Sequence, residues 1–253
     1  MSNYWKFSFL RPATVVGAVG SLAVLASIGS AQVLEGNLLL RQVDGSNNGW
    51  VNQVFPDFAD YSTGMGSMVT IDGYWQVWEI QIYQVGSTPN TWYGNVNQAV
   101  LNVTRQVGGA PDSAYDPTIV NSGAGVVYSD LVSVTQDQPS VDNQSFRIRA
   151  LTATIPELQG IEPGDYVFSL APIVHYGDYG QSFTAGAGVG SAPDYMRNPG
   201  NGFGYGTDWF PISAIGTEVN TQWAIGINGM VPEPSGILAL AAGLALLARK
   251  RRR

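Results

Sequence analysis

The chain has 253 residues, and its 12 Lys and Arg residues against 19 Asp and Glu residues give a formal net charge of −7 at pH 7. An acidic surface repels phosphate backbones, so we expect no nucleic acid among the partners of this protein. Cysteine is absent, which excludes disulfide bonds and thiol chemistry.

The N-terminal segment has the features of a secretory signal peptide. Two basic residues precede an apolar stretch from 13 to 28, and small residues follow at the positions that a signal peptidase reads. We expect residues 1–31 to be removed by signal peptidase after export through the general secretion machinery, with Gly29 and Ala31 before the cut and Gln32 after it. A retained N-terminal anchor is the alternative, but Ala and Gly weaken the stretch as a permanent span.

The expected exported domain, residues 32–230, is strongly acidic. It contains five basic and 18 acidic residues, a net charge of −13, because seven of the 12 basic residues lie in the two terminal segments. A domain of this length can bury a sizeable core, and the apolar content of the whole chain, 45%, supports this. Packing therefore has to supply the stability of the domain without covalent cross-links.

Polar residues near the start of this domain are similar to the first half of a calcium-binding loop. Asp44, Ser46 and Asn48 place oxygen ligands at alternate positions, and a glycine follows at the sixth position. The twelfth position is Phe55 instead of the usual glutamate, which favours a plain polar turn. We expect no cofactor, with Ca²⁺ as the alternative.

Apolar residues alternate with polar ones over most of the domain. In residues 74–83, Trp78, Ile80 and Ile82 share one face while Glu79 lies on the other, as a half-buried strand requires. Further strands are expected at 37–43, 67–71, 100–107, 126–134, 144–155, 165–174 and 222–227. Within 144–155 the apolar set changes phase, which predicts a β-bulge.

These strands predict an all-β fold. They are rich in β-branched and aromatic residues, and Gly, Pro, Asn and Asp separate them. We therefore expect an antiparallel two-sheet sandwich, with a jelly roll as the favoured variant. The stretch 177–206 contains nine glycines and no clear alternation, and we interpret it as a long surface loop.

Patterns that would indicate catalysis are weak. His175 is the single histidine, no nucleophile elbow accompanies it, and one histidine without cysteine leaves too few ligands for zinc. Glu79 is the best single candidate for a glycosidase carboxylate, but no second carboxylate stands out as its partner. We therefore expect a protein that is not an enzyme.

Four aromatic residues are candidates for a sugar-binding platform, because flat rings can pack against the faces of pyranose rings. These residues are Trp75, Trp92, Tyr93 and Trp209. Core packing is the competing interpretation, since large aromatic side chains dominate protein cores. The two interpretations differ in one property, because a platform requires exposed rings.

The C-terminal segment, residues 231–253, has three parts in a fixed order. These are the motif Val231, Pro232, Glu233, Pro234 and Ser235, an apolar run from 237 to 248, and the basic residues Arg249, Lys250, Arg251, Arg252 and Arg253. The segment resembles the PEP-CTERM sorting signal. The resemblance implies recognition by an exosortase-type membrane protease in a Gram-negative bacterium.

Elementary physical chemistry gives each part of this tail a role. The two prolines keep a helix from extending back and present the motif as extended chain. The twelve residues of the apolar run span only ~18 Å as a helix against a ~30 Å hydrocarbon core, so we expect a short, marginal transmembrane helix. The basic block stays on the cytoplasmic side. The domain is then anchored transiently and ends at the cell surface or outside the cell. An ordinary C-terminal anchor is the alternative.

Three classes of function fit these features. The first is a non-enzymatic protein of the cell surface or the extracellular matrix, such as a biofilm, whose tail directs its sorting and processing. The second is a carbohydrate-binding β-sandwich module with extracellular polysaccharide as its partner. The third is an enzyme that acts on polysaccharide, which would need convergent carboxylates in a cleft.

A pair of variants tests the sorting motif. Glu233→Ala keeps the apolar run and the basic block but removes the single charge of the motif, so uncleaved precursor should accumulate in the membrane with its domain exported. Deletion of residues 237–253 should instead release soluble protein without processing, because we expect the acidic domain to have no other attachment to the membrane. Immunoblots of membrane, surface and medium fractions from the native host check both. A Glu233→Ala protein distributed like wild type would contradict the sorting role.

Overall fold

The computed structural model describes parts of one compact unit of the chain, residues 31–232. The described residues are 38–42, 49–86, 96–136, 141–143, 146–155, 160–186, 194–215 and 223–231. The predicted cleavage site, the calcium candidates and nearly all of the tail lie outside them, at Gly29, Ala31, Gln32, Asp44, Ser46, Asn48 and residues 232–253. Among the residues described, no helix is both long and apolar enough to span a membrane.

Strands make up nearly all of the regular structure, and within the described residues fourteen of them join in one sheet. The main order is β1 (Leu38–Gln42), β14 (Ile225–Met230), β4 (Gln76–Gly86), β9 (Phe146–Thr154), β7 (Val126–Gln136), β5 (Gln98–Val107), β10 (Gly164–Pro172), β3 (Gly64–Ile71), β12 (Tyr195–Arg197) and β13 (Phe210–Pro211). Off this path, β11 (Ser182–Ala185) pairs with β4 and with β2 (Gly49–Val51), β6 (Ala110–Pro111) pairs with β5, and β8 (Val141–Asn143) pairs with β9. The helices described are short: η3 (Ala59–Tyr61), α1 (Tyr176–Tyr179) and η4 (Ile212–Ile215).

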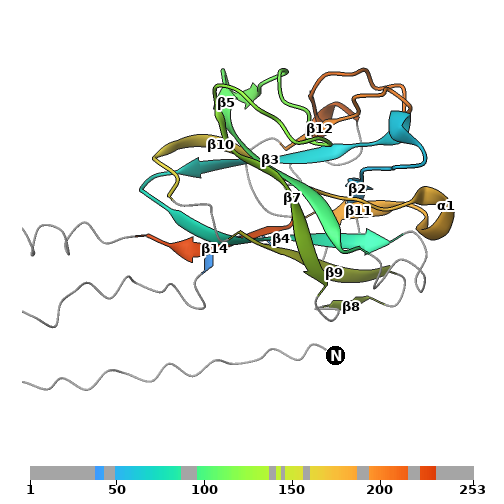
Figure 1. Ribbon diagram of the computed structural model, residues 1–253, viewed down its shortest axis with the longest axis horizontal. Coiled ribbons are helices and arrows are strands. Elements are labelled where there is room, and N and C mark those ends of the chain that lie inside the picture. The colour runs from blue at the N-terminus through green and yellow to red at the C-terminus, as the bar shows by residue number, and fades with distance from the viewer. Residues whose placement is uncertain are drawn as a thin grey trace, which may run out of the picture. The chain divides into compact units, whose positions relative to one another are not determined.

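The sheet curls over on itself. Figure 1 shows that β4, β9 and β14 lie opposite β3, β5 and β10. All pairings between these strands are antiparallel, so the expected antiparallel all-β class is confirmed. Each of the eight strand ranges expected from the sequence overlaps an observed strand, namely β1, β3, β4, β5, β7, β9, β10 and β14.

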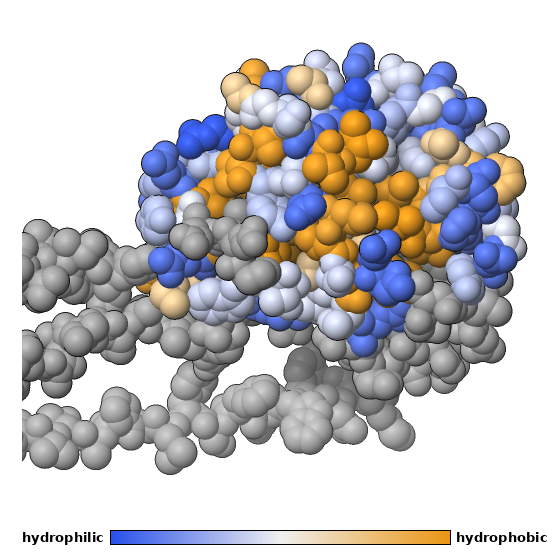
Figure 2. Space-filling view, in the orientation of Figure 1, coloured by the Kyte–Doolittle hydropathy of each residue, from blue (hydrophilic) through white to orange (hydrophobic). Residues whose placement is uncertain are grey.

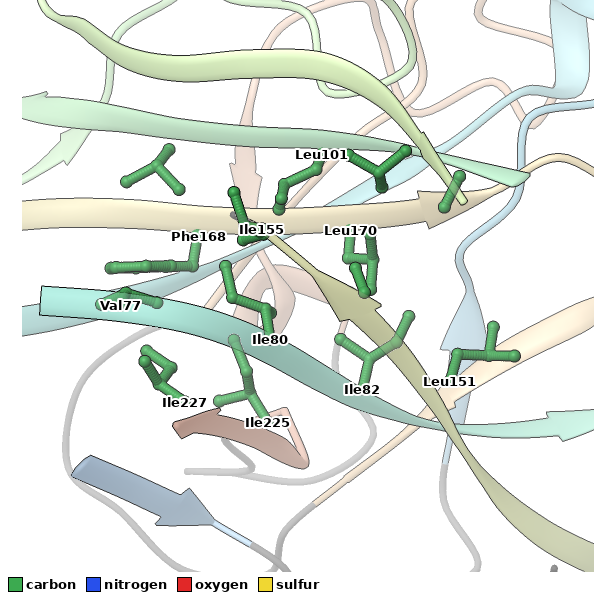
Figure 3. Close-up of a cluster of buried hydrophobic side chains, with 14 of the residues drawn as sticks. Val77, Ile80, Ile82, Leu101, Leu151, Ile155, Phe168, Leu170, Ile225 and Ile227 are labelled. Carbon is green, nitrogen blue, oxygen red and sulfur yellow. The ribbon is translucent and has the colours of Figure 1, made fainter. Parts of the chain in front are cut away.

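The main hydrophobic core fills the space inside the curl. Aliphatic side chains of β4, β9 and β14 face aliphatic and aromatic side chains of β5 and β10 (Figure 3). The most central members are Ile80, Ile82, Leu101, Leu151, Phe168, Leu170, Ile225 and Ile227, each at most 4% exposed. Truncating one of these side chains to alanine would cost ~2–5 kcal/mol of unfolding free energy.

A bulge in β4 corrects the expected alternation. Asn228 pairs with Glu79 and Gly229 pairs with Val77, so Trp78 is an extra residue on β4. Because of this shift Val77 points into the core, 2% exposed, while Trp78 is only half-buried. The inward position predicted for Trp78 is therefore wrong. The bulge predicted within 144–155 is also wrong over the described pairs, since β9 pairs with β4 from Ile148 to Thr154 without a shift.

The expected surface loop at 177–206 contains regular structure as well as turns. Most of helix α1 and the whole of strands β11 and β12 lie within it, and β11 is hydrogen-bonded on both sides, to β4 and to β2. Ser182 and Thr184 of β11 are buried, with 0% and 1% of their surface exposed. A central strand that buries hydroxyl side chains shows no apolar alternation, which is why the sequence pattern conceals it.

A second, smaller core cluster contains an unusual carboxyl group. Met65, Met196, Ile212 and Trp223 form this cluster, and Asp194 lies beside it with 3% of its surface exposed. Burial raises the pKa of Asp194 to about 8, although the backbone N–H groups of Trp223 and Met68 donate to it and lower the pKa. The folded domain therefore holds a neutral carboxylic acid at this position over much of the ordinary pH range.

This pKa predicts the pH dependence of stability. An Asp with the ordinary pKa of 3.8 loses its proton in the unfolded chain far below the pH at which folded Asp194 does, so stability falls as pH rises between these two values. Asp194→Asn keeps a carbonyl acceptor for the N–H of Trp223 but cannot ionise. Relative to this variant, wild type should lose ~5 °C or more in Tm between about pH 5 and about pH 8, measured by thermal unfolding. A constant difference in Tm across this range would show that Asp194 does not titrate there.

Candidate functional site: an aromatic cleft

An open cleft of about 320 Å³ is lined mainly by aromatic side chains. The lining residues are Phe55, Phe58, Tyr61, Tyr176, Gln181 and Phe203. They come from three segments far apart in the sequence, residues 53–62, 174–182 and 198–206, which we call the first, second and third walls. The volume is at the lower end of the range for small-molecule sites, so the cleft suits a short part of an elongated ligand.

Three of these rings are nearly half exposed. The exposed fractions are 48% for Phe58, 43% for Tyr61 and 46% for Tyr176. Phe58 contacts Tyr176 edge to face, with ring centroids 5.5 Å apart and planes at 83°, and Tyr61 contacts Phe203 at 5.2 Å and 88°. Such pairs hold the rings in defined orientations. The cleft therefore offers fixed aromatic surfaces to a ligand.

Gln53 joins the first wall to both ends of the second. Its side chain is completely buried, and its Nε2 donates to the carbonyl oxygens of Val174 at 2.9 Å and Gly180 at 3.2 Å. Its Oε1 accepts from the N–H of Ser182 at 2.6 Å. In addition, the N–H of Val174 donates to the carbonyl of Val54 at 3.1 Å. One buried amide thus fixes both ends of the second wall to the first wall.

Asp57 makes a further link between the same two walls. Its carboxylate oxygens accept from the N–H groups of Tyr176 at 2.9 Å and Gly177 at 2.8 Å, in the only turn of α1. Desolvation acts to raise the pKa of Asp57, but these donors and nearby His175 together hold it below its ordinary value. The carboxylate therefore stays ionised and acts as an anchor that positions the ring of Tyr176.

The third wall is bonded to the first around Asp60. The buried Asn198 donates through Nδ2 to the carbonyls of Asp60 at 2.8 Å and Ser62 at 2.9 Å, and its Oδ1 accepts from the N–H of Phe203 at 3.0 Å. The N–H of Gly202 also donates to the Asp60 carbonyl, at 2.8 Å. These bonds place Phe203 against Tyr61. All three walls are therefore held by buried or backbone hydrogen bonds.

The residues expected as a sugar-binding platform do not line this cleft. Trp75 is buried in the core, 7% exposed, and Trp209 is half-buried with its Nε1 bonded to backbone carbonyls in the loop 112–115. Trp92 and Tyr93 lie outside the described residues. Sequence reasoning misses the cleft because its rings stand in turns of three separate segments, where no periodic pattern marks them.

The catalytic candidates have other partners. His175 is exposed at the start of α1, and its Nδ1 lies 4.0 Å from Oδ1 of Asp57. Glu79 is half-buried on β4, where its Oε1 accepts from the amides of Gln81, at 3.1 Å, and Asn228. Glu79 is not among the residues that line the cleft. The structure therefore does not bring these two candidates together at the site.

Another exposed apolar surface has a different character. Figure 2 shows hydrophobic residues gathered over the part of the molecule where β5 and β7 lie in Figure 1. Leu131 of β7 is 46% exposed, and Ile119 and Val120, in the loop bonded to β5 and β7 through Asn102 and Asn121, are 55% and 51% exposed. These side chains are aliphatic and offer no flat rings. The aromatic cleft is therefore the stronger candidate for a small-molecule or sugar site.

Comparison with known proteins identifies no relative of this chain. No family model matches it, and neither a curated protein nor a solved structure is significantly similar to it. The aromatic cleft and the terminal segments therefore have to carry the functional argument by themselves.

Two glycine variants test how tightly the third wall is built. A Cβ at Gly200 would lie 2.3 Å from Cα of Asp60, so Gly200→Ala must displace the loop from the first wall and should cost ~1–3 kcal/mol of unfolding free energy. Gly73→Ala is the matched control, because its Cβ would meet only Val231, at 3.8 Å. Thermal unfolding compares the two. Equal Tm values would mean that the loop is not held against Asp60 in solution.

Proposed function

We propose that this chain is an exported, non-enzymatic protein that binds polysaccharide at the cell surface or in the extracellular matrix through its aromatic cleft. The observation that carries the proposal is the set of three nearly half-exposed rings, Phe58, Tyr61 and Tyr176, around a cleft of about 320 Å³. Exposing such rings to water is costly, and a preorganised apolar surface of this kind is typical of a binding site.

The chemistry of the cleft suits a sugar. The faces of pyranose rings carry C–H groups that pack on aromatic rings, while sugar hydroxyls need hydrogen-bond partners. The tyrosine hydroxyls of Tyr61 and Tyr176 can supply both donors and acceptors at the cleft. Because the cleft is open, a long polymer could pass through it with only one short stretch in contact.

The terminal segments supply the location in this proposal. Signal peptidase removes residues 1–31, the general secretion machinery exports the domain, and an exosortase-type protease acts at the motif from Val231 to Ser235. The domain of residues 32–230 is then a two-sheet sandwich of jelly-roll type, with which the curled antiparallel sheet is compatible. Polysaccharide binding would hold the released protein in the matrix after its anchor is lost.

Alanine variants of the cleft test this function. Tyr176→Ala and Phe58→Ala should each weaken binding to the preferred polysaccharide ~10-fold, because each removes an exposed ring face, a loss of ~1.4 kcal/mol of binding free energy. Tyr74→Ala is the matched control, since Tyr74 is 45% exposed but does not line the cleft. Affinity electrophoresis in gels containing neutral, acidic or amino-sugar polymers measures the change. Retention by none of the polymers, or equal retention of all three variants, would overturn the proposal.

A further inference from the structure

The walls of the cleft carry negative charge and very little positive charge. The first wall contains Asp57 and Asp60, and the second contains Asp178, with Asp60 and Asp178 both exposed. None of the three walls contains Lys or Arg, and His175 is their single basic side chain. Each exposed ring thus belongs to a residue that has an Asp within two positions of it in the chain.

The two arginines whose side chains the structure describes have hydrogen-bond or ion-pair partners outside the three walls. Among the arginines whose side chains the structure describes, Arg105 pairs with Glu162 at 3.3 Å. Arg197 directly precedes the third wall, but its guanidinium donates to the backbone carbonyls of Ser113, Tyr115 and Thr207 at 2.7 to 2.9 Å. The expected exported domain adds its net charge of −13 to the local field. An acidic polymer approaching the cleft would therefore be repelled.

A protonated amine fits the same surroundings well. The faces of Tyr and Phe rings attract ammonium groups, and the attraction grows where water is partly excluded. The Asp side chains of the first and second walls add Coulomb attraction for the same group. The cleft thus offers an amino sugar two favourable interactions in addition to ring stacking.

Building on the proposed polysaccharide-binding function, we infer that the cleft selects polymers of amino sugars that carry free amino groups, as in partly deacetylated hexosamine chains, over N-acetylated or acidic chains. Exposed carboxylates are screened by water, so each of Asp60 and Asp178 should contribute a factor of roughly two to five in affinity. Together with the rings, the free amines should raise affinity ~10-fold over the N-acetylated chain of equal length.

The test uses the purified protein and two probes, an oligomer of glucosamine and an oligomer of N-acetylglucosamine of the same length. Calorimetry measures the binding of each at about pH 6, in about 0.1 M and about 1 M salt. The variants are Asp60→Asn and Asp178→Asn, and the control is Asp72→Asn, an exposed carboxylate just beyond the opposite end of β3 from the first wall. We expect the glucosamine oligomer to bind ~10-fold more tightly, with the preference reduced by both variants and by high salt but not by the control.

The outcomes separate this inference from the proposed function. If both oligomers bind equally and Tyr176→Ala weakens both, the cleft binds sugar but the amine preference is wrong. If the glucosamine oligomer binds as well to Tyr176→Ala as to wild type, or Asp72→Asn acts like Asp60→Asn, the attraction belongs to the acidic surface as a whole and the inference is wrong. If neither oligomer binds while another polysaccharide does so through the cleft, the inference fails and the proposed function stands.

Discussion

Two adjacent buried amide side chains, Asn52 and Gln53, join segments that do not pair directly with one another in the sheet, such as β11 with β10 and β3. Asn52 Nδ2 donates to the Leu170 carbonyl on β10, at 2.9 Å, and to Oγ1 of Thr184 on β11, at 2.7 Å, while its Oδ1 accepts from the N–H of Met65 on β3. In the same way, the Gln53 side chain bonds to Val174, Gly180 and Ser182 and so joins the first wall to the second. A buried amide left without partners costs ~1–3 kcal/mol, so these segments have to assemble together.

The cleft depends on this buried polar layer. Hydrogen bonds that Gln53 and Asn198 donate and that Asp57 accepts join the three walls, although more than a hundred residues of chain separate the first wall from the second. The cleft is therefore formed before any ligand arrives, and little conformational entropy remains to be lost on binding. Ser182, whose hydroxyl donates to Gln84 Oε1, extends the same layer into β4. Because the chain has no cysteine, this layer and the apolar core have to supply the stability that disulfide bonds supply in other proteins.

The sequence predicts the parts of this fold that are apolar and repetitive. The antiparallel all-β class and the eight strands rich in Val, Ile and Leu follow from alternation, and burial of Ile80 and Ile82 follows from the same pattern. The alternation of apolar and polar residues does not predict two kinds of feature. One extra residue at Trp78 reverses the inward face of a strand without any mark in composition, and β11 buries hydroxyl groups where the pattern expects apolar ones. The sequence pattern does not predict the cleft either, because tertiary hydrogen bonds through Asn198 and Gln53, and not sequence spacing, bring its rings together.

The last described strand, β14, is paired on both sides, and this pairing affects its resistance to a pulling force. β14 lies between β1 and β4, and its chain continues at Val231 toward Pro232 and Glu233. A pull directed along β14 would load two rows of antiparallel hydrogen bonds in shear, so that many bonds resist at once, whereas a pull across the strand would open them one at a time. The C-terminal strand therefore resists tension directed along its axis better than tension directed across it.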